Sequence, residues 1–320
     1  MHVRKLVQAG AASHTVSLPK DWVERNALKK GDTIYIDEKS PRELVISLDE
    51  RKRANKPVRE ITIEVDKKDI GMIQREVTSA YINNYQTIHL IGKEINDKIK
   101  GIREMMQDFV ALEIAEQTST KVTAKDLLNL QEISIEATIR RMDMILRSII
   151  KDSLTSLEGN NVLESIQFRD SDVNRLYFLL YRLIKSALQD PEMAETLKIK
   201  PHDALHLWYL AVNIEGIADS GKQLCSLFQH LEKKHDVKSL KSLYTQGEAS
   251  YIDAMNAFFK KDRKLADAVA ARRSSFIKDA DTYLEKNKSP QSMELIQEFK
   301  DLSSSIANIA RLVIDQDPAV

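Results

Sequence analysis

The chain has 320 residues, with 48 Lys and Arg against 48 Asp and Glu, and it contains 9 Gly, 7 Pro and a single Cys. Zero net charge argues against a molecule whose whole surface binds polyanions, and one cysteine excludes an internal disulfide framework or a thiolate zinc site. The sequence holds neither a signal peptide nor eighteen consecutive apolar residues, so we expect a cytoplasmic protein without membrane insertion. The scarcity of Gly and Pro favours long helices.

The first fifty residues alternate apolar and polar side chains, as short strands do. Two pairs of strands are predicted, the second over residues 33–36 and 43–46, with a helix of barely two turns over residues 21–28 between the pairs. This β-β-α-β-β unit, residues 1–50, is too small to close a core of its own. We therefore expect it to dimerise or to pack on the rest of the chain.

This first unit is basic. From Met1 to Lys30 there are six Lys and Arg against only Asp21 and Glu24. Four of these cations are our candidates for contacts to the phosphates of DNA: Arg4, Lys5, Lys20 and Arg25. A symmetric dimer would double the cluster. The alternative is that the unit only dimerises or binds a partner protein.

A charged connector over residues 51–57 leads into a second small α/β segment. Alternating apolar residues predict strands at residues 61–65, 87–91 and 113–122, and apolar residues at helical spacing lie between them. The pattern predicts a βαβαβ domain over residues 57–124.

From Asn129 onward, apolar residues recur at spacings of three and four, the period of amphipathic helices. Six helices are predicted, three within residues 129–232 and three within residues 236–316, so the body reads as two three-helix bundles. Asn129 and Glu132 have the spacing of a capping box before the first helix. The fold class is thus mainly α, with a small β N-terminal domain and a small α/β middle layer.

Three acidic residues lie beside the apolar stripes of this body. Glu215 and Asp219 stand one turn apart on one helix, where like charges repel, and Asp170 falls within the stripe of the preceding long helix. Such residues are paired, protonated or bound to a cation. One interpretation is a site for Mg, Ca, Mn or Fe, which accept carboxylate oxygens. The other is ion pairing with basic residues of the same helices: Arg169, Arg175 or Lys222.

The sequence shows no catalytic motif. His202 and His206 are one turn apart but lack the Glu of HExxH, so we expect them to be surface residues. There is no GxxxxGK[ST], GxGxxG or GxSxG, and no nucleophile with its base, so we expect that the protein is not an enzyme. A carboxylate-metal enzyme in a helical bundle is a third alternative, but the Glu-x-x-His signature of such sites is missing.

Several stretches are similar to known families. Residues Ser17 to Ile34, SLPKDWV through LKKGDTI, resemble the SpoVT/AbrB DNA-binding domain, a swapped-hairpin β barrel. Residues Arg169 to Leu180, RDSDVNRLYFLL, and Asn213 to Asp219, NIEGIAD, resemble the helix motifs of PhoU-type phosphate-uptake regulators. The combined order of an AbrB head, a small α/β middle and a PhoU-like six-helix body resembles the archaeal AbrB-PhoU proteins.

The resemblance implies a multinuclear metal cluster on each three-helix half, held on facing helices by an acidic residue and an Asp four positions later. Glu215 and Asp219 match this pattern in full. Asp170 matches the acidic position of the preceding helix, but Asn174 supplies a neutral ligand four positions on. The candidate metal ligands are therefore Asp170, Asn174, Glu215 and Asp219, for a divalent or iron-type metal.

The second half departs from the pattern. Its corresponding helices carry Arg273-Ser274-Ser275-Phe276 and Lys300-Asp301-Leu302-Ser303-Ser304, with no acidic pair at the required spacing. We therefore expect no second cluster, and no cofactor besides the one metal site.

The resemblance further implies a regulator of phosphate uptake and phosphate homeostasis. Its body would contact a phosphate transporter or the transporter's sensor partner, and its head would bind DNA as part of a homodimer. The middle domain would couple the two. The alternative is a plain AbrB-family transcription factor whose helical body serves oligomerisation or ligand sensing.

Overall fold

The computed structural model describes residues 3–10, 13–40, 43–48, 58–129, 132–231 and 235–316. The predicted connector over residues 51–57 lies outside this set. The chain divides into two compact units, Met1–Val58 and Arg59–Val320.

The first unit has the predicted β-β-α-β-β order. Its elements are β1 (Val7–Gln8), β2 (His14–Thr15), α1 (Lys20–Arg25), β3 (Tyr35–Ser40) and β4 (Glu43–Ser47). β1 pairs with β2 and β3 with β4, both antiparallel, as two separate two-stranded sheets. The described residues of this single chain therefore form two hairpins and no closed barrel.

None of the side chains that the structure describes in this unit is buried. Some of its large apolar side chains are half-buried, and others are exposed, among them Val3, Leu6, Val7, Val16, Ile36 and Leu44. This agrees with the expectation that about fifty residues cannot close a core alone.

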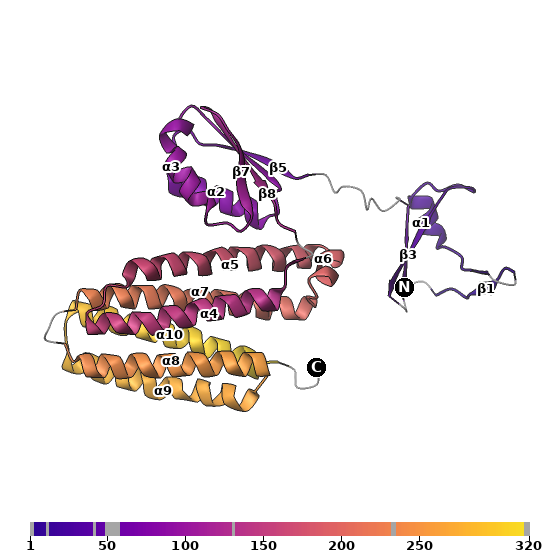
Figure 1. Ribbon diagram of the computed structural model, residues 1–320. Coiled ribbons are helices and arrows are strands. Elements are labelled where there is room, and N and C mark those ends of the chain that lie inside the picture. Colours follow the sequence, from indigo (N-terminus) through magenta and orange to yellow (C-terminus); the bar gives the residue numbers. More distant parts are fainter. Residues whose placement is uncertain are drawn as a thin grey trace. The chain divides into compact units, whose positions relative to one another are not determined.

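The second unit begins with a small α/β domain. Its elements are β5 (Glu60–Glu64), α2 (Ile70–Ile82), β6 (Thr87–Ile91), α3 (Ile95–Met106), β7 (Leu112–Gln117) and β8 (Lys121–Asp126). The strands form one sheet in the order β5-β6-β8-β7, in which only β5 and β6 are parallel. Both helices lie against this sheet (Figure 1).

The prediction of one strand over residues 113–122 is wrong, because a turn divides it into β7 and β8. The hydroxyl oxygen of Thr118 accepts hydrogen bonds from the backbone N–H groups of Thr120 and Lys121, at 3.3 and 3.0 Å. A hydroxyl that satisfies two successive backbone donors favours a turn over an extended chain. The domain is therefore βαβαββ.

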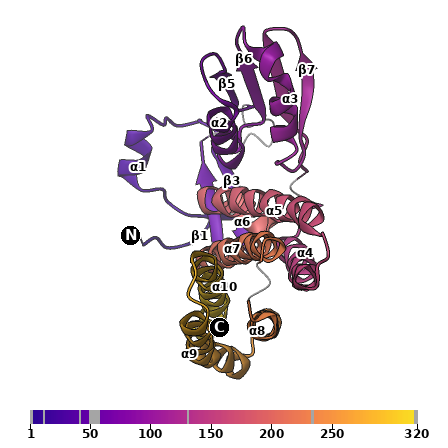
Figure 2. The same cartoon turned by 90° about the vertical axis from the view of Figure 1, so that its left-hand side faces the viewer.

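The helical body has the six long helices that were predicted. They are α4 (Ile135–Thr155), α5 (Leu163–Gln189), α7 (Pro201–Gln229), α8 (Val237–Lys260), α9 (Arg263–Lys286) and α10 (Pro290–Ile314), with a short unpredicted helix α6 (Pro191–Thr196). Figure 2 looks along these helices and shows α4, α5 and α7 grouped apart from α8, α9 and α10. α7 packs against α10, and one apolar core runs through both bundles. None of the described helices combines the length and the apolar content that a membrane span requires.

The predicted capping box at Asn129 is wrong. The N-cap of α4 is Ser134, whose side chain accepts a hydrogen bond of 3.2 Å from the backbone N–H of Ala137. The Asn129 amide instead donates to the Glu132 carboxylate at 2.7 Å, before the helix begins. Both pairs have the i, i+3 spacing, so the spacing alone did not distinguish the true cap.

The α/β domain rests on α5. Arg182 is 1% exposed, forms an ion pair with Asp126, and donates from Nε to Asn84 Oδ1 at 3.0 Å. One turn earlier on α5, the ring of Phe178 lies 5.9 Å from that of Phe109 in the core of the domain. The domain is thus fixed to the same helix that carries Asp170.

Candidate functional site

Three of the four predicted metal ligands come together at the seam between α5 and α7. The ammonium of Lys222 lies 2.6 Å from Asp170 Oδ2 and 2.6 Å from Asp219 Oδ1, so one cation joins the two helices. Glu215 lies on α7 one turn before Asp219. We call Asp170, Glu215, Asp219 and Lys222 the lysine–carboxylate cluster. No hydrogen bond joins Asn174 to it among the described residues.

The cluster is partly withdrawn from water. Asp170 is 4% exposed and its Oδ1 has no hydrogen-bond partner among the described residues. Burial raises the pKa of Asp170, although the Lys222 ammonium opposes this. Burial, together with Asp219 and Asp170, raises the pKa of Glu215 to about 7. Burial lowers the pKa of Lys222, but its bonds to Asp170 and Asp219 outweigh that effect and the net shift is upward.

These residues do not fit the metal cluster that the resemblance implies. In the part of the chain that the structure describes, no three His, Cys, Asp or Glu side chains are grouped so that they could hold a metal ion. The place between Asp170 and Asp219 is taken by the Lys222 ammonium, which would repel a metal cation there. Of the two interpretations left open by the sequence, ion pairing is the one that the structure contains.

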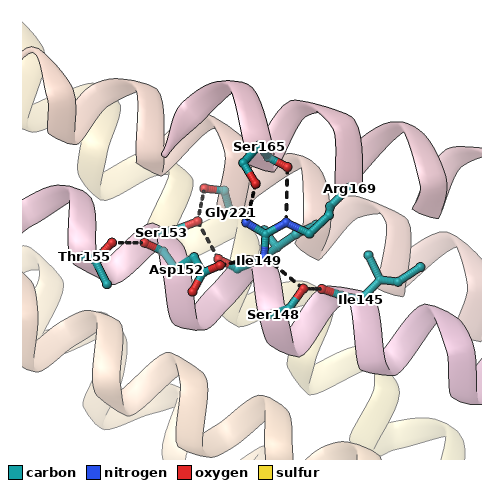
Figure 3. A network of polar contacts seen from close by, with 9 residues as sticks. All are labelled: Ile145, Ser148, Ile149, Asp152, Ser153, Thr155, Ser165, Arg169 and Gly221. Carbon is teal, nitrogen blue, oxygen red and sulfur yellow. Dashed lines mark hydrogen bonds and ion pairs between the residues drawn. The ribbon is translucent and has the colours of Figure 1, made fainter. Parts of the chain in front are cut away.

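Of the three basic residues considered, Lys222 is the one that pairs with the cluster. Arg175 lies 3.6 Å from Asp172 instead. Arg169 turns to α4, where its Nη1 donates to Ser148 Oγ at 3.0 Å and to Asp152 Oδ2 at 2.8 Å (Figure 3). Neighbouring positions on α5 therefore serve different helices, because successive side chains of a helix point in different directions.

Beside Lys222, a further polar contact joins a different pair of helices, α4 and α7. The buried hydroxyl of Ser153 lies 2.7 Å from the carbonyl oxygen of Ile149 and 3.2 Å from that of Gly221 (Figure 3). A Cβ at Gly221 would lie 3.1 Å from the side chain of Ile149. This contact was not predicted, and the signal for it in the sequence is a glycine inside a long helix.

The four candidate DNA contacts are exposed in the first unit: Arg4, Lys5, Lys20 and Arg25. The first two precede β1, and the last two begin and end α1. Lys20 lies 3.5 Å from the Glu24 carboxylate, and Arg25 Nε donates to the carbonyl oxygen of Asp21 at 3.1 Å. Both pairs are local to α1 and leave the charges open to solvent.

The histidine pair lies apart from the cluster, in the first turns of α7. His202 is exposed, and its Nε2 lies 3.3 Å from the Asp203 carboxylate. His202 and His206 line a cavity of about 780 Å³ together with Phe258 and Phe259. His202 is therefore a surface residue, as expected, whereas His206 is half-buried beside the cavity.

The segment that contains the lysine–carboxylate cluster matches a known domain family. Residues 139–227 match the model of the PhoU domain, a range that runs from α4 through α7 and contains all four cluster residues. The crystal structure of PhoU from Pseudomonas aeruginosa is similar, with 15% identity, a TM-score of 0.48, and coverage of 56% of this chain and 93% of that chain. No curated protein matches the chain significantly. The domain match does not include the first fifty residues.

Proposed function

We propose that this chain is a non-enzymatic regulator of phosphate homeostasis that acts in the cytoplasm. The observation that carries the proposal is the match of residues 139–227 to the PhoU domain. PhoU-type proteins regulate phosphate uptake, so the helical body would contact a phosphate transporter or the transporter's sensor partner. The seam between α5 and α7 is the candidate control point, because it holds charged groups at the edge of the core.

The position of the α/β domain supports a coupling role. Asp170 of the cluster and Arg182, which fixes the α/β domain, lie on the single helix α5. They lie twelve positions apart on α5, which is about 18 Å along a helix. A change at the cluster that moves α5 would therefore be passed to the α/β domain by a rigid element.

We propose in addition that the first unit is a DNA-binding head that dimerises. Its exposed apolar side chains, such as Leu6 at 70% and Leu44 at 68%, need a covering surface that a second copy would supply. Its four exposed cations would then be doubled across the two-fold axis and could contact phosphates. The alternative, a plain transcription factor with an oligomerising body, shares this head but has no link to phosphate transport.

Deletion of the gene in its native host tests the proposal. We expect phosphate uptake to continue at high external phosphate, where the parent strain reduces it, and complementation with the full chain to restore the reduction. Unchanged uptake and unchanged phosphate-responsive transcripts in the deletion strain would contradict the proposal.

A head variant separates the two roles. It replaces the candidate phosphate contacts with alanine at Arg4, Lys5, Lys20 and Arg25. If the head binds DNA, the variant restores control of uptake but not the transcript response, and it loses the salt-dependent gel shift of the full chain. A variant that restores both responses would show that the head does not act through DNA.

A further inference from the structure

The second three-helix bundle contains a site of opposite charge to the lysine–carboxylate cluster. When the two halves are aligned by sequence, RDSD at residues 169–172 falls on RRSS at residues 272–275, so Arg273 takes the place of Asp170. EGIAD at residues 215–219 falls on SSIAN at residues 304–308, so Ser304 replaces Glu215 and Asn308 replaces Asp219.

The structure supports this alignment. A Cβ at Gly216 would lie 3.6 Å from Ser305 Oγ, so the aligned positions of α7 and α10 face each other. In the second bundle, Arg273 Nη2 donates to Ser304 Oγ at 3.0 Å and joins α9 to α10. In the first bundle, Asp170 is also joined to the facing helix α7, there through Lys222.

A cavity of about 240 Å³ lies beside Arg273, between α8, α9 and α10. None of the residues that line it is acidic, and its polar lining consists of Gln246, Ser250, Arg272, Arg273, Ser275 and Ser303. Since each water in the liquid has a share of about 30 Å³, the cavity has room for one small ion with a few waters. We call it the arginine–serine cavity.

Of the two arginines that line this cavity, only Arg273 lacks a carboxylate partner among the described residues. Arg272 forms an ion pair with Asp253 at 2.7 Å, whereas no carboxylate lies within ion-pair distance of Arg273 among the described residues. A guanidinium has five N–H donors in a planar fork, of which Arg273 gives one to Ser304, and the hydroxyls of Ser250 and Ser303 add further donors. The Ser275 hydroxyl already donates to the carbonyl oxygen of Arg272. This donor set matches the oxygens of a tetrahedral oxyanion.

We propose that the arginine–serine cavity binds a small tetrahedral oxyanion, and that this ion is inorganic phosphate. The oxyanion chemistry follows from the residues alone, whereas the choice of phosphate rests on the proposed function. The two halves of the body then have distinct roles. The first carries an acidic seam closed by its own lysine, and the second carries a basic cavity open to an anion.

Isothermal titration calorimetry of the full chain with inorganic phosphate tests the proposal. Parallel titrations use sulfate and chloride at matched ionic strength. We expect saturable binding of phosphate. Arg273→Gln is expected to weaken phosphate binding at least about tenfold, because the loss of one hydrogen bond to a charged group reduces affinity by about this factor. Arg273→Lys keeps the charge but loses the fork, and is expected to bind with intermediate affinity.

The matched control is Arg263→Gln, which removes an exposed arginine at the start of the same helix, outside the cavity. It is expected to bind phosphate as the wild type does. Ser250→Leu would fill the cavity without changing its charge, and is expected to abolish binding. Circular dichroism and thermal melting of each variant establish that it is folded.

Absence of saturable binding to the wild type, or equal weakening by Arg263→Gln and Arg273→Gln, would overturn the site. Equal affinity for sulfate and phosphate would overturn the choice of phosphate as the ligand. The proposed function fails separately, because it depends on uptake in the deletion strain. Unchanged uptake with intact phosphate binding contradicts the function alone, and altered uptake without binding contradicts the site alone.

Discussion

Arg182 on α5 and Asp126 at the end of β8 form an ion pair whose side chains are only 2% and 6% exposed. The guanidinium also donates to Asn84 and lies over the ring of Tyr81, 4.8 Å from its centre. A charged pair at this depth is stabilised when its remaining hydrogen-bonding groups are satisfied. Asn84 Oδ1 accepts from Nε and Nη2 of Arg182, whereas Nη1 has no hydrogen-bond partner among the described residues. The contact therefore fixes where the α/β domain sits on the body.

Arg182→Met is expected to lower the free energy of unfolding by about 3 to 5 kcal/mol, because it leaves the buried Asp126 carboxylate without its cation. Urea unfolding measures this loss. Lys241→Met is the control, since Lys241 and Glu158 form a pair that is 50% and 54% exposed, and such pairs contribute about 0 to 1 kcal/mol. Equal losses in the two variants would contradict a special role for Arg182.

Sequence patterns were sufficient for the helical body because its apolar residues repeat with the helical period over long segments. Met142, Leu146 and Ile149 follow this period on α4, and all three are 0% exposed. Asp170 was also singled out correctly as an acid beside that core. Periodicity does not indicate which cation pairs with Asp170. Three basic residues were equally placed in the sequence, and only the packing of α5 on α7 selects Lys222.

The role of Arg182 could not be predicted from the sequence for the same reason. An arginine between apolar residues of a helix predicts an exposed position or an interruption of the apolar face. Its partners Asn84 and Asp126 lie 98 and 56 positions away, on a different domain. The prediction of a single strand where β7 and β8 lie failed for a local reason. Thr118 and Thr120 favour strands by propensity, but the Thr118 hydroxyl forms the turn.

Glu215 is expected to make stability depend on pH. Burial, Asp219 and Asp170 raise its pKa from 4.5 to about 7. The folded state thus holds this proton more tightly than the unfolded chain, so the contribution is fully present below about 4.5 and is lost as pH rises through about 7.

We expect the ionisation of Glu215 to lower the free energy of unfolding by roughly 1 to 2 kcal/mol between pH 5 and pH 8, allowing for solvent screening. Urea unfolding at several pH values measures this loss. Glu215→Gln should flatten the profile across this window, whereas Glu164→Gln, at an exposed position of α5, should leave it as in the wild type. A wild-type stability that rises with pH across this window relative to Glu215→Gln would contradict the prediction.

Removal of Lys222 is expected to turn the cluster into a weak cation site. Lys222→Met leaves Asp170 and Asp219 facing each other without the ammonium, so we expect a loss of about 2 kcal/mol in the free energy of unfolding. Millimolar Mn²⁺ should raise the melting temperature of this variant and leave that of the wild type unchanged, because carboxylate oxygens bind such cations. Elemental analysis showing one or more metal ions per wild-type chain would refute the assignment of Lys222 as the resident cation.

Tyr251 joins the two bundles through a carboxylate of α4. Its hydroxyl donates to Asp143 Oδ1 at 2.8 Å, and Arg147 donates to the same oxygen at 2.9 Å. Tyr251→Phe is expected to cost about 1 to 2 kcal/mol, since Asp143 keeps Arg147. Asp143→Ala should cost more, because it leaves the buried tyrosine hydroxyl without a partner. Urea unfolding measures both, and a loss for Tyr85→Phe as large as that for Tyr251→Phe would contradict the prediction.

Cys225 offers a direct probe of the seam between α5 and α7. It is the only cysteine of the chain, it is 0% exposed, and burial raises the pKa of its thiol. Since the thiolate is the reactive form, we expect no reaction with a thiol reagent in the native protein and one equivalent after unfolding in guanidinium. Cys225 lies three residues after Lys222 on α7, so loss of the Lys222 ion pairs should open this turn and accelerate labelling. Lys222→Met is therefore expected to react faster than Lys241→Met under native conditions, and equal labelling rates in the two variants would show that Lys222 does not hold the seam closed.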